Sequence, residues 1–510
     1  MRRFNFEIEA TPHTTPPPGM ASSDPADPQD FDDEEYVVNR QGQREPVSFG
    51  KIGDRISQLM SATYGKRLRK VNRVKIERQV IGRFISGMTT LEIDNMIVEV
   101  CQAMIPKHPQ YSILAARFVV SNLQKSITHS FAEVYEHLDR GPKKSRISPA
   151  VLTIARRYES EIEARIDQRR DFDNDAFGIA TIMRSYCLRD PETGEVAETP
   201  QHMYMRMAIT LRCLVRGSEG VEGGTPIEDE TVLQYALEEA FNVYDYISTK
   251  RISHASPTAT SSGTILLQLS SCFQVEVDDD FGSLMSVLAD IGMMSKTGGG
   301  ISVCLSRMRA KGALIRSSGG RSVGVEGYIR LLNQEQDYAN QGGLRKGAFA
   351  CYLHIWHADV FTFLEMGLPK GPRFEQRKDG RLLKYALMIP DRFMRALIEE
   401  IDVSERLRAG EEVPAEEVAA AGNWYLMSPD ESPDLTEVYD ERSINHDDGP
   451  GGAFSLRYDK YIAEGRYREV VKASAIVKEI IRAISLTGNP YMLLADHINR
   501  QSNLTTESTV

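Results

Sequence analysis

The alternation of strand-like and helix-like segments beyond about residue 251 constrains the fold more than any other feature of the sequence. Three segments have strand patterns, "ISVCL", "GAFACYLHIW" and "KYALMIP", and between them lie helical patterns such as "GSLMSVLADIGMMSK" and "GYIRLLNQEQDYANQ". Strands that alternate with helices form βα units. We therefore expect an α/β fold, with a parallel sheet or barrel, over residues 251–510.

Further segments extend this pattern toward the end of the sequence. "DVFTFLEM" predicts a helix capped by Asp359, "DRFMRALIEEI" predicts a helix, and "NPYMLL" predicts a strand. "RLRAGEEVPAEEVAAAG" and "SINHDDGPGGA" have the composition of surface insertions. The glycines of "SKTGGGISV" either let two backbones approach closely or leave room for a substrate ribose.

The chain before residue 251 divides into three parts. Residues 1–34 are rich in proline and acidic residues and are predicted to be a disordered tail. Residues 35–125 are predicted to form a compact α+β module, in which Thr89-Thr90 is the expected N-cap of a helix. Residues 126–250 are expected to be mostly helical.

The start of the α+β module has the pattern of a β-hairpin followed by a helix. Tyr36–Val38 and Val47–Phe49 are the expected strands, and Gln41-Gly42 supplies the turn. Arg40 and Lys51 would bring positive charge, and backbone N–H groups would complete a cradle for a triphosphate. A plain surface hairpin has the same pattern, so this segment alone leaves both interpretations open.

Charge and composition exclude several functional classes. The formal net charge of the 510 residues is −11, of which residues 1–35 contribute −7. The remainder is nearly balanced and has no basic stripe, which argues against nucleic-acid binding. No segment approaches the roughly 18 apolar residues that a membrane helix needs. The six cysteines form no CxxC pair, which argues against a zinc site or disulfide scaffold and favours a reducing, cytoplasmic compartment.

Two segments contain residue types that could support catalysis. In "HASPTATSSGTILLQLSSCF", Cys272 follows a run of small hydroxyl residues, and Ser256, Ser270 and Ser271 could bind phosphate or hydroxyl groups. A buried cysteine is more often a small apolar core residue. His354 and His357 in "HIWH" have a possible metal spacing, but no further cluster completes a site, so a core or capping role is favoured and no bound metal is expected.

Several motifs occur together in a family-specific order. The segments "HASPT…QLSSCF", "SKTGGGISV", "NQGGLRKGAFACYLHIWHADVFTFLEM" and "TGNPYMLLADHINRQSN" resemble the large subunit of class I ribonucleotide reductases of the eukaryotic-like branch. "VVNRQGQREPVSFGKI…TTLEIDN…KHPQYSILAARFVVSNL" is similar to that family's ATP cone, and "AETPQHMYMRMAI" fits the segment between. The resemblance implies an ATP cone over 35–125, a helical region over 126–250, and the first half of a ten-stranded α/β barrel over 251–510.

The resemblance also implies roles for individual residues. Cys272 matches the reducing cysteine beside the 2′-carbon of the substrate. The substrate-binding positions are Ser256, Ser271, Gly299 and Gly300. The specificity-effector positions are Asp279 or Asp280, Lys296, Arg309 and Ser322, with Gln341, Arg345 and Lys346 in the loop that reports effector identity. The ATP-cone positions are Arg40, Glu45, Lys51, Thr90 and Asp94, and Asn39 stands where a lysine is usual.

The family's chemistry implies effectors and partners. ATP or dATP and deoxynucleoside triphosphates, each with Mg²⁺, would act as allosteric effectors. A separate di-metal small subunit would generate the radical, a thioredoxin- or glutaredoxin-type reductant would reset the cysteine pair, and the chain would form a homodimer or higher oligomer. The sequence stops at "RQSNLTTESTV", just before the family's Asn-x-Cys-x-Glu radical loop. A complementary C-terminal chain is therefore expected.

Three functional interpretations follow from this resemblance. The first is the N-terminal part of a reductase large subunit, from an interrupted or split gene, that is inactive until a second polypeptide supplies the radical loop. The second is a catalytically inactive regulatory or decoy subunit that binds nucleotides. The third is a cobalamin-dependent relative, which the eukaryotic-like motifs disfavour.

Overall fold

The structure is a computed structural model that describes residues 35–127, 129–139, 146–215, 224–339, 347–368, 380–438 and 452–501. The predicted acidic tail, most of the predicted insertion "SINHDDGPGGA", and the effector-loop residues Gln341, Arg345 and Lys346 lie outside the described residues. The chain divides into two compact units, Met1–Asn122 and Leu123–Val510.

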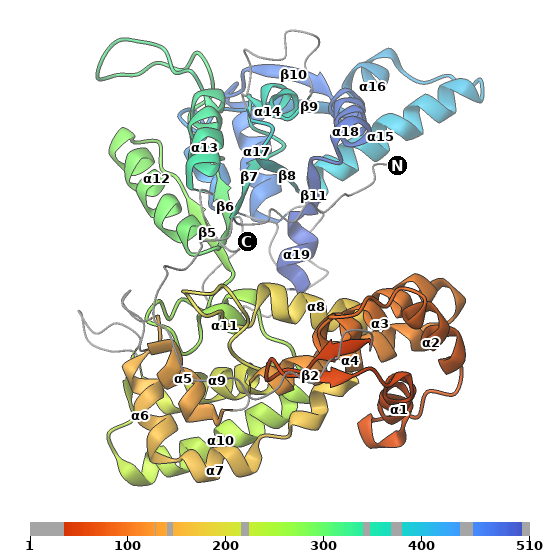
Figure 1. The fold of residues 1–510 in the computed structure, drawn as a ribbon. Helices are drawn as coiled ribbons and strands as arrows, with labels where there is room; N and C mark the ends of the chain where they lie inside the picture. The colour runs from red at the N-terminus through yellow and green to blue at the C-terminus, as the bar shows by residue number, and fades with distance from the viewer. Residues whose placement is uncertain are drawn as a thin grey trace, which may run out of the picture. The chain divides into compact units, whose positions relative to one another are not determined.

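The first unit combines a short hairpin with helices, as the sequence predicts for an α+β module. Its core consists of apolar residues on one face of each helix, including Ile56, Ile97 and Leu114. The elements are β1 (Tyr36–Val38), β2 (Arg44–Pro46), α1 (Phe49–Met60), α2 (Arg73–Ile81), α3 (Thr90–Met104) and α4 (Gln110–Ser126), the last of which crosses the boundary between the units (Figure 1).

The second strand of this hairpin lies earlier than predicted. The prediction of Val47–Phe49 is wrong, because the strand is Arg44–Pro46 and Phe49 is the first residue of α1. The turn explains the difference: the Asn39 side-chain oxygen accepts hydrogen bonds from the N–H groups of Gln41 and Gln43, at 3.0 and 2.9 Å. Such an Asx turn is tight and lets pairing start again at Arg44.

Helix α3 begins where the sequence predicts. The Thr89 side chain accepts a hydrogen bond from the backbone N–H of Glu92, and the Glu92 carboxylate accepts one from the N–H of Thr89. This reciprocal capping box satisfies two backbone donors that the first turn leaves unpaired. Thr90 is therefore the first helical residue rather than the cap.

The first part of the second unit is helical, as predicted for residues 126–250. A fully buried ion pair joins its elements: the Arg206 guanidinium donates to Glu198 at 2.8 and 3.1 Å, and both side chains are inaccessible to solvent. Arg206 also donates to the backbone oxygen of Ala259. The elements are α5 (Phe131–Asp139), α6 (Pro149–Arg157), α7 (Glu159–Arg165), α8 (Ala176–Ser185), α9 (Pro200–Cys213), β3 (Leu214–Val215), β4 (Thr225–Pro226), α10 (Glu230–Ser248) and α11 (Ser256–Ser261).

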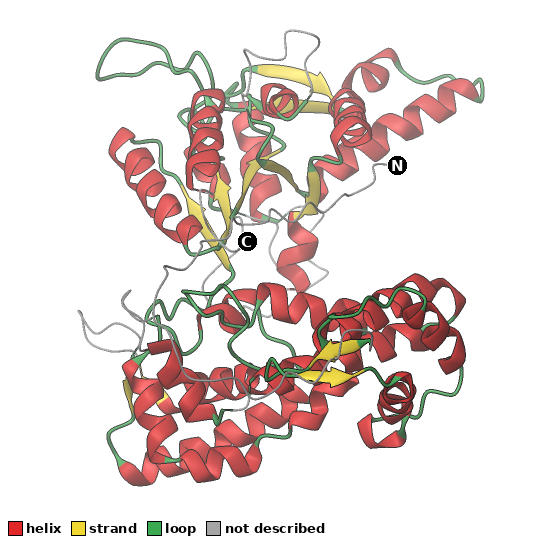
Figure 2. Cartoon of the chain, in the orientation of Figure 1, coloured by secondary structure: helices red, strands yellow, loops and turns green. Residues whose placement is uncertain are grey.

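The rest of the second unit contains a parallel five-stranded sheet, which confirms the predicted βα pattern. The strand order is β11-β8-β7-β6-β5, and every neighbouring pair is parallel. Figure 2 draws the strands in yellow. The sheet elements are β5 (Cys272–Glu276), α12 (Phe281–Lys296), β6 (Gly300–Cys304), α13 (Val325–Ala339), β7 (Ala348–His354), α14 (Val360–Met366), β8 (Lys384–Ile389), α15 (Asp391–Arg408), β11 (Tyr491–Leu494) and α19 (Ala495–Gln501).

The segment between α15 and β11 contains further helices and two strands. It consists of α16 (Ala415–Ala420), β9 (Asn423–Leu426), α17 (Ala453–Ala463), β10 (Glu469–Lys472) and α18 (Ala473–Thr487). Strands β9 and β10 form an antiparallel pair outside the parallel sheet. The predicted insertion "RLRAGEEVPAEEVAAAG" corresponds to the end of α15 and to α16, and its exposed residues agree with a surface position.

Among the described residues, the main core lies on one face of the parallel sheet. In β7, Phe349, Cys351 and Leu353 are fully buried and pack with residues of α13 and α14, which are labelled beside the sheet in Figure 1. The intervening residues point to the opposite face, because side chains alternate along a strand. Cys272 lies on that opposite face and is exposed.

Asp359 does not cap α14 with its side chain. It occupies the N-cap position, but no capping hydrogen bond forms. Its carboxylate instead accepts hydrogen bonds from the backbone N–H groups of Lys311 and Val325, which precede it in sequence. The sequence therefore predicted the helix boundary but not the use of the side chain.

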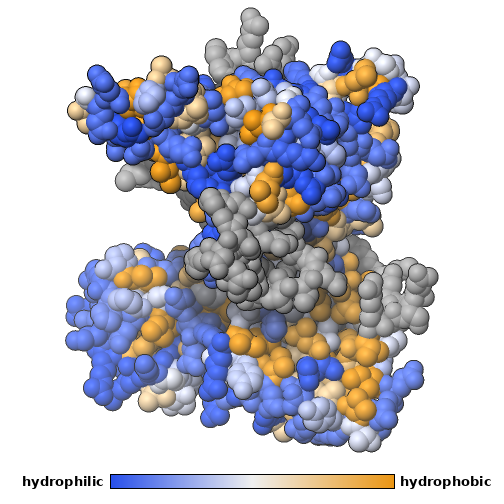
Figure 3. Space-filling model, turned by 180° about the vertical axis from the view of Figure 1, so that it is seen from behind, coloured by the Kyte–Doolittle hydropathy of each residue, from blue (hydrophilic) through white to orange (hydrophobic). Residues whose placement is uncertain are grey.

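The face drawn in Figure 3 is mainly hydrophilic and has separate hydrophobic patches. Large apolar side chains that reach solvent include Phe177, Phe281 and Tyr338. Within the described ranges, no helix combines the length and the apolar character needed to cross a membrane.

The Glu198–Arg206 pair predicts a specific pattern of stability changes. Replacing Arg206 by Met leaves the Glu198 carboxylate buried without its charge partner, and the free energy of unfolding of the helical region should fall by about 3–5 kcal/mol. Urea unfolding followed by circular dichroism would measure the loss. The double variant E198Q/R206M should recover part of it, and R482M, which removes an exposed arginine on α18, should change little. An R206M loss no larger than that of R482M would contradict this account.

Candidate functional site

The Cys272 thiol lies at the start of β5 and is exposed. Its Sγ is 3.5 Å from the Ser271 hydroxyl oxygen. Cys272 pairs with Gly300 on the neighbouring parallel strand, and the Gly300 N–H donates to the Ser271 carbonyl oxygen at 2.8 Å. The structure therefore brings three of the predicted site residues, Ser271, Cys272 and Gly300, into one place.

The glycines next to this thiol allow a close approach of two elements. A Cβ atom on Gly299 would lie 2.6 Å from the Phe273 ring and 3.2 Å from the Met294 carbonyl oxygen. No real side chain tolerates the first distance, so a larger residue at 299 would push β5 away from the end of α12. Close backbone packing is one of the two roles that the sequence pattern allowed.

Ser256 is the first residue of the short helix α11, and its hydroxyl lies 3.3 Å from the Tyr186 hydroxyl. Within the same helix, the Thr258 hydroxyl donates to the Leu269 carbonyl oxygen at 3.1 Å. This bond ties α11 to the segment that leads into Cys272. Helix α11, which contains Ser256, and strand β5, which begins with Cys272, are thus connected through a short, hydrogen-bonded stretch of chain.

Exposure separates Cys272 from the other cysteines. Cys101, Cys187, Cys213 and Cys351 are buried, and burial raises the pKa of the Cys101 and Cys351 thiols to about 12. Burial also raises the pKa of Cys304, whose thiol lies 3.5 Å from the Ser306 hydroxyl. Because the thiolate is the reactive form, these five thiols are protected while Cys272 is accessible.

The two acids proposed for effector binding have different partners. Asp279 forms an ion pair with Arg309, with 2.6 Å between Oδ2 and Nε. Asp280 is the N-cap of α12 and accepts a hydrogen bond from the Ser283 N–H at 3.0 Å. Lys296, the last residue of the same helix, is exposed. The structure therefore brings Asp279 and Arg309 together, whereas Asp280 has a local structural role.

The remaining effector residue, Ser322, lies in a hairpin that follows Arg309. Its backbone pairs with Gly312 and Ala313 at 2.8 Å, and its hydroxyl accepts a hydrogen bond from the Gly324 N–H at 3.0 Å. Arg309 donates to the carbonyl oxygen of Leu314 in the same hairpin at 2.8 Å. Arg309 and Ser322 thus belong to one ordered structure.

In the first unit, charged residues converge between the hairpin and the helices. Asp94, which is nearly buried on α3, accepts two hydrogen bonds of 2.8 Å from Arg55 and lies 3.9 Å from Arg40. Lys51 and Glu45 form an ion pair at 3.3 Å, and a hydrogen bond from Asn39, together with Lys51, lowers the pKa of the Glu45 carboxyl. The structure therefore pairs Arg40 with Asp94 and Lys51 with Glu45.

Sequence reasoning missed two residues of this cluster. Arg55 pairs with Asp94, and the Asn122 side-chain oxygen accepts hydrogen bonds from both Arg40 and Arg55, at 2.7 and 3.2 Å. Arg55 lies four residues after Lys51, and that spacing places both side chains on the same face of α1. This spacing could have indicated Arg55, whereas nothing near Asn122 in the sequence indicated its role.

The two histidines of "HIWH" are buried and bond to nearby protein atoms. His354 Nδ1 lies 2.8 Å from the Ser306 hydroxyl, and His357 Nε2 lies 2.8 Å from the Met308 carbonyl oxygen. Burial lowers the pKa of His354 to about 4. Among the residues that the structure describes, no group of three or more His, Cys, Asp or Glu side chains is arranged to hold a metal ion.

Three protein families match consecutive parts of the chain. Residues 35–126 match the ATP cone domain, residues 172–266 match the all-alpha domain of ribonucleotide reductase, and residues 270–510 match the barrel domain of ribonucleotide reductase. The chain belongs to the ribonucleotide reductase large-subunit family. The predicted family resemblance and the predicted order of cone, helical region and α/β barrel are thereby confirmed.

Individual members of the ribonucleotide reductase family are similar over most of the chain. The chain is 37% identical over 455 residues to the ribonucleoside-diphosphate reductase large subunit of African swine fever virus (isolate Tick/Malawi/Lil 20-1/1983). The matched region covers 89% of this chain and 53% of the viral protein. The chain is also 36% identical over 483 residues to the Schizosaccharomyces pombe large chain, covering 93% and 52%, and 36% identical over 476 residues to the Danio rerio large subunit, covering 92% and 52%. The chain spans about half the length of the curated relatives it matches.

The exposure of the thiol in this ribonucleotide reductase homologue predicts selective chemical modification. Under native conditions, Ellman's reagent should modify Cys272 in a fast phase, because the other cysteines are buried or partly buried. Absorbance of the released thiolate would count the reacting groups. The variant C272S should lose the fast phase, and C351S should keep it. A fast phase that survives in C272S would show that another thiol is accessible.

Proposed function

We propose that this chain supplies the allosteric regions and part of the catalytic site of a ribonucleoside-diphosphate reductase, which converts ribonucleoside diphosphates to deoxyribonucleotides. The observation that carries this proposal is the position of Cys272: an exposed thiol at the start of a parallel strand, in contact with Ser271 and paired with Gly300. Relatives of similar sequence carry the name of that enzyme.

The proposed reaction removes the 2′-hydroxyl of the ribose as water and requires two electrons. Cys272 and a second thiol supply them and become a disulfide, while a thiyl radical takes the 3′-hydrogen at the start of the cycle and returns it at the end. Thiol–disulfide exchange with an external dithiol restores Cys272. Ser256 and Ser271 would hold the phosphate and ribose of the substrate, and Gly299 and Gly300 would form the surface beneath it.

A rigid position for the thiol supports this assignment. Cys272 lies on a strand whose next residue, Phe273, packs against the main core, and β5 is hydrogen-bonded to β6. Displacing a reacting group by about 1 Å can cost about 100-fold in rate. A strand fixed by the core restricts such displacement better than a solvated loop does.

The proposal places two allosteric functions in separate parts of the chain. ATP or dATP with Mg²⁺ would bind beside Arg40, Glu45, Lys51, Thr90 and Asp94, with Arg40 and Lys51 supplying positive charge for the phosphates. A deoxynucleoside triphosphate would bind beside Asp279 or Asp280, Lys296, Arg309 and Ser322, and Gln341, Arg345 and Lys346 would report its identity to the substrate.

The proposed enzyme needs partners. We place it in the cytoplasm, with a separate di-metal small subunit as the source of the radical, a thioredoxin- or glutaredoxin-type reductant, and a homodimeric or larger assembly. The radical cysteine and the second thiol of the pair would come from sequence beyond these 510 residues, on the same polypeptide or on a complementary chain.

A second candidate function is nucleotide-dependent regulation without catalysis. Two observations favour it: the ion pairs of the first unit, such as Arg55–Asp94, and the hydrogen-bonded Arg309–Ser322 region of the second unit. In that case the chain would bind ATP and deoxynucleotides and associate with intact subunits. Nucleotide binding without activity, even when the remainder of the barrel is supplied, would favour this second function.

The catalytic proposal predicts the effect of removing the thiol. When the remaining barrel sequence and a radical-generating subunit are supplied, C272S should lower deoxynucleotide formation by on the order of 1,000-fold or more, as expected for a group that reacts covalently. The 510-residue chain without the remaining barrel should show no turnover. The control C351S, which changes a buried thiol facing the helices, should remain active. Undiminished reduction by C272S would refute the catalytic role.

The cone proposal predicts the effect of removing one cation. Arg40 lies beside Asp94 and Asn122, and R40M should weaken ATP binding to the 510-residue chain about tenfold, since charge-assisted bonds to phosphate are strong. Isothermal titration calorimetry with MgATP would measure the dissociation constant. Arg44, whose guanidinium stacks on Tyr36 in the same hairpin, is the matched control, and R44M should bind ATP nearly normally. Equal affinities for R40M and R44M would argue against this site.

A further inference from the structure

A hairpin with only positive formal charge follows Arg309. We call residues 310–324 the cationic hairpin; it contains Lys311, Arg316 and Arg321 and no acidic residue. Its two sides are bridged between Leu314 and Arg321, and all three cations are exposed. Several cations on one ordered hairpin suit a polyphosphate, provided that the hairpin is held in one position.

Asp359 holds the two ends of the cationic hairpin together. Its nearly buried carboxylate accepts the N–H of Lys311 at 3.0 and 3.1 Å and the N–H of Val325 at 3.1 Å. Gly324 allows this approach: a Cβ atom there would lie 2.2 Å from the carboxylate and 2.7 Å from the Lys311 nitrogen. The base of the hairpin is thus closed by a single side chain from the start of α14.

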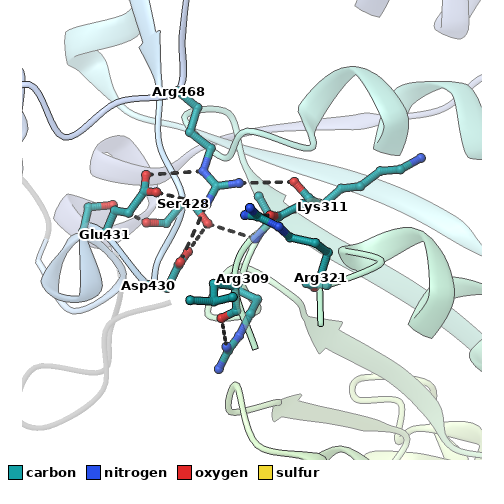
Figure 4. Close-up of polar contacts among 12 residues, drawn as sticks. Arg309, Lys311, Arg321, Ser428, Asp430, Glu431 and Arg468 are labelled. Carbon is teal, nitrogen blue, oxygen red and sulfur yellow. Dashed lines mark hydrogen bonds and ion pairs between the residues drawn. The ribbon is translucent and has the colours of Figure 1, made fainter. Parts of the chain in front are cut away.

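Residues far along the chain hold the outer side of the same base. The Arg468 guanidinium donates to the carbonyl oxygen of Lys311 at 3.2 Å, and the Ser428 hydroxyl accepts the N–H of Ala310 at 2.9 Å (Figure 4). Lys311 is therefore bound through its N–H by Asp359 and through its carbonyl by Arg468. These bonds fix the backbone from which the cationic side chains extend.

Arg468 is itself held rigidly. Its Nε and Nη2 atoms donate to the two oxygens of Glu431 at 3.3 and 3.0 Å, and Asp430 lies 3.6 Å away. Its backbone N–H donates to the carbonyl oxygen of Leu426, which fixes it beside the β9–β10 pair. A guanidinium has enough donors in a fixed plane to bind Glu431 and Lys311 together, whereas a lysine ammonium lacks this planar geometry.

We propose that Arg468 is a positioning residue for the effector triphosphate: it does not contact the nucleotide but fixes the cationic hairpin through the Lys311 carbonyl oxygen. This inference rests on the proposed function of the Asp279–Arg309 region as an effector site. Without this bond, the hairpin has more conformations available, and ordering it on binding lowers the affinity. Arg468 therefore sets the affinity of a site to which its own side chain does not belong.

The test measures two nucleotides on the same 510-residue chain. Calorimetric titration with dTTP and Mg²⁺ reports the effector region of the second unit, and titration with MgATP reports the cone. In R468M the dissociation constant for dTTP should rise about tenfold, since one hydrogen bond and the order that it imposes are lost. In R468K, which keeps the charge beside Glu431, the rise should be smaller. ATP binding at the cone should not change in either variant.

A matched control separates positioning from general stability. R482M removes an exposed arginine that pairs with Glu479 on α18 and should leave both dissociation constants unchanged. The thermal midpoint of R468M should fall below that of R482M, because Arg468 also binds Glu431; unchanged ATP affinity in R468M, measured below its midpoint, therefore shows that a selective loss of dTTP affinity reports the position of the hairpin. Wild-type affinity for dTTP in R468M, with dTTP bound by the unmodified chain, would overturn the role of Arg468 alone. Failure of the unmodified chain to bind dTTP would overturn the effector site as well.

Discussion

Burial of one face of the parallel sheet is the constraint on which the candidate site depends. Phe273 and Val275 of β5 pack against the main core together with Ile301 and Val303 of β6, while Cys272 is exposed. Side chains alternate along a strand, so a shift of one residue would bury the thiol and expose Phe273. The position of the reactive group is therefore fixed by apolar packing on the other side of the sheet.

Close backbone contact adds a second constraint at the same place. The Gly300 N–H reaches the Ser271 carbonyl oxygen, and Gly299 leaves room for the Phe273 ring. These contacts join β5, β6 and the end of α12 around the thiol. The glycines have a sufficient structural reason to be there, and a ribose bound above them would make use of a surface that packing already requires.

A nearly buried carboxylate makes several hydrogen bonds in each of the two regions proposed to bind nucleotides. In the first unit, the nearly buried Asp94 pairs with Arg55, and Asn122 accepts hydrogen bonds from Arg55 and Arg40. In the second unit, Asp359 closes the cationic hairpin at its base. In both places a carboxylate that is nearly buried fixes backbone or guanidinium groups, and exposed cations lie nearby.

Many features of the fold could be predicted because they depend on residues close together in sequence. Apolar spacing indicated β6, β7, β8 and β11 of the barrel region but not β5, and the Thr89–Glu92 capping box marked the start of α3. The second strand of the first hairpin was misplaced, since the Asn39 side chain forms an Asx turn that the apolar pattern does not report. The choice of Arg40, Glu45, Lys51 and Asp94 as candidate residues came from family motifs rather than from spacing, and the structure shows them as two ion pairs.

The sequence by itself determined the family and the order of cone, helical region and barrel, whereas the position of Cys272 at the start of a strand came from the structure. Only the tertiary structure decided how the polar side chains are used. Asp359 has the sequence position of a helix cap, yet it binds Lys311, 48 residues away, and Arg468 binds the same residue from 157 residues away. Periodicity and capping are local, whereas these partners meet only because the sheet and its surrounding segments bring distant parts of the chain together.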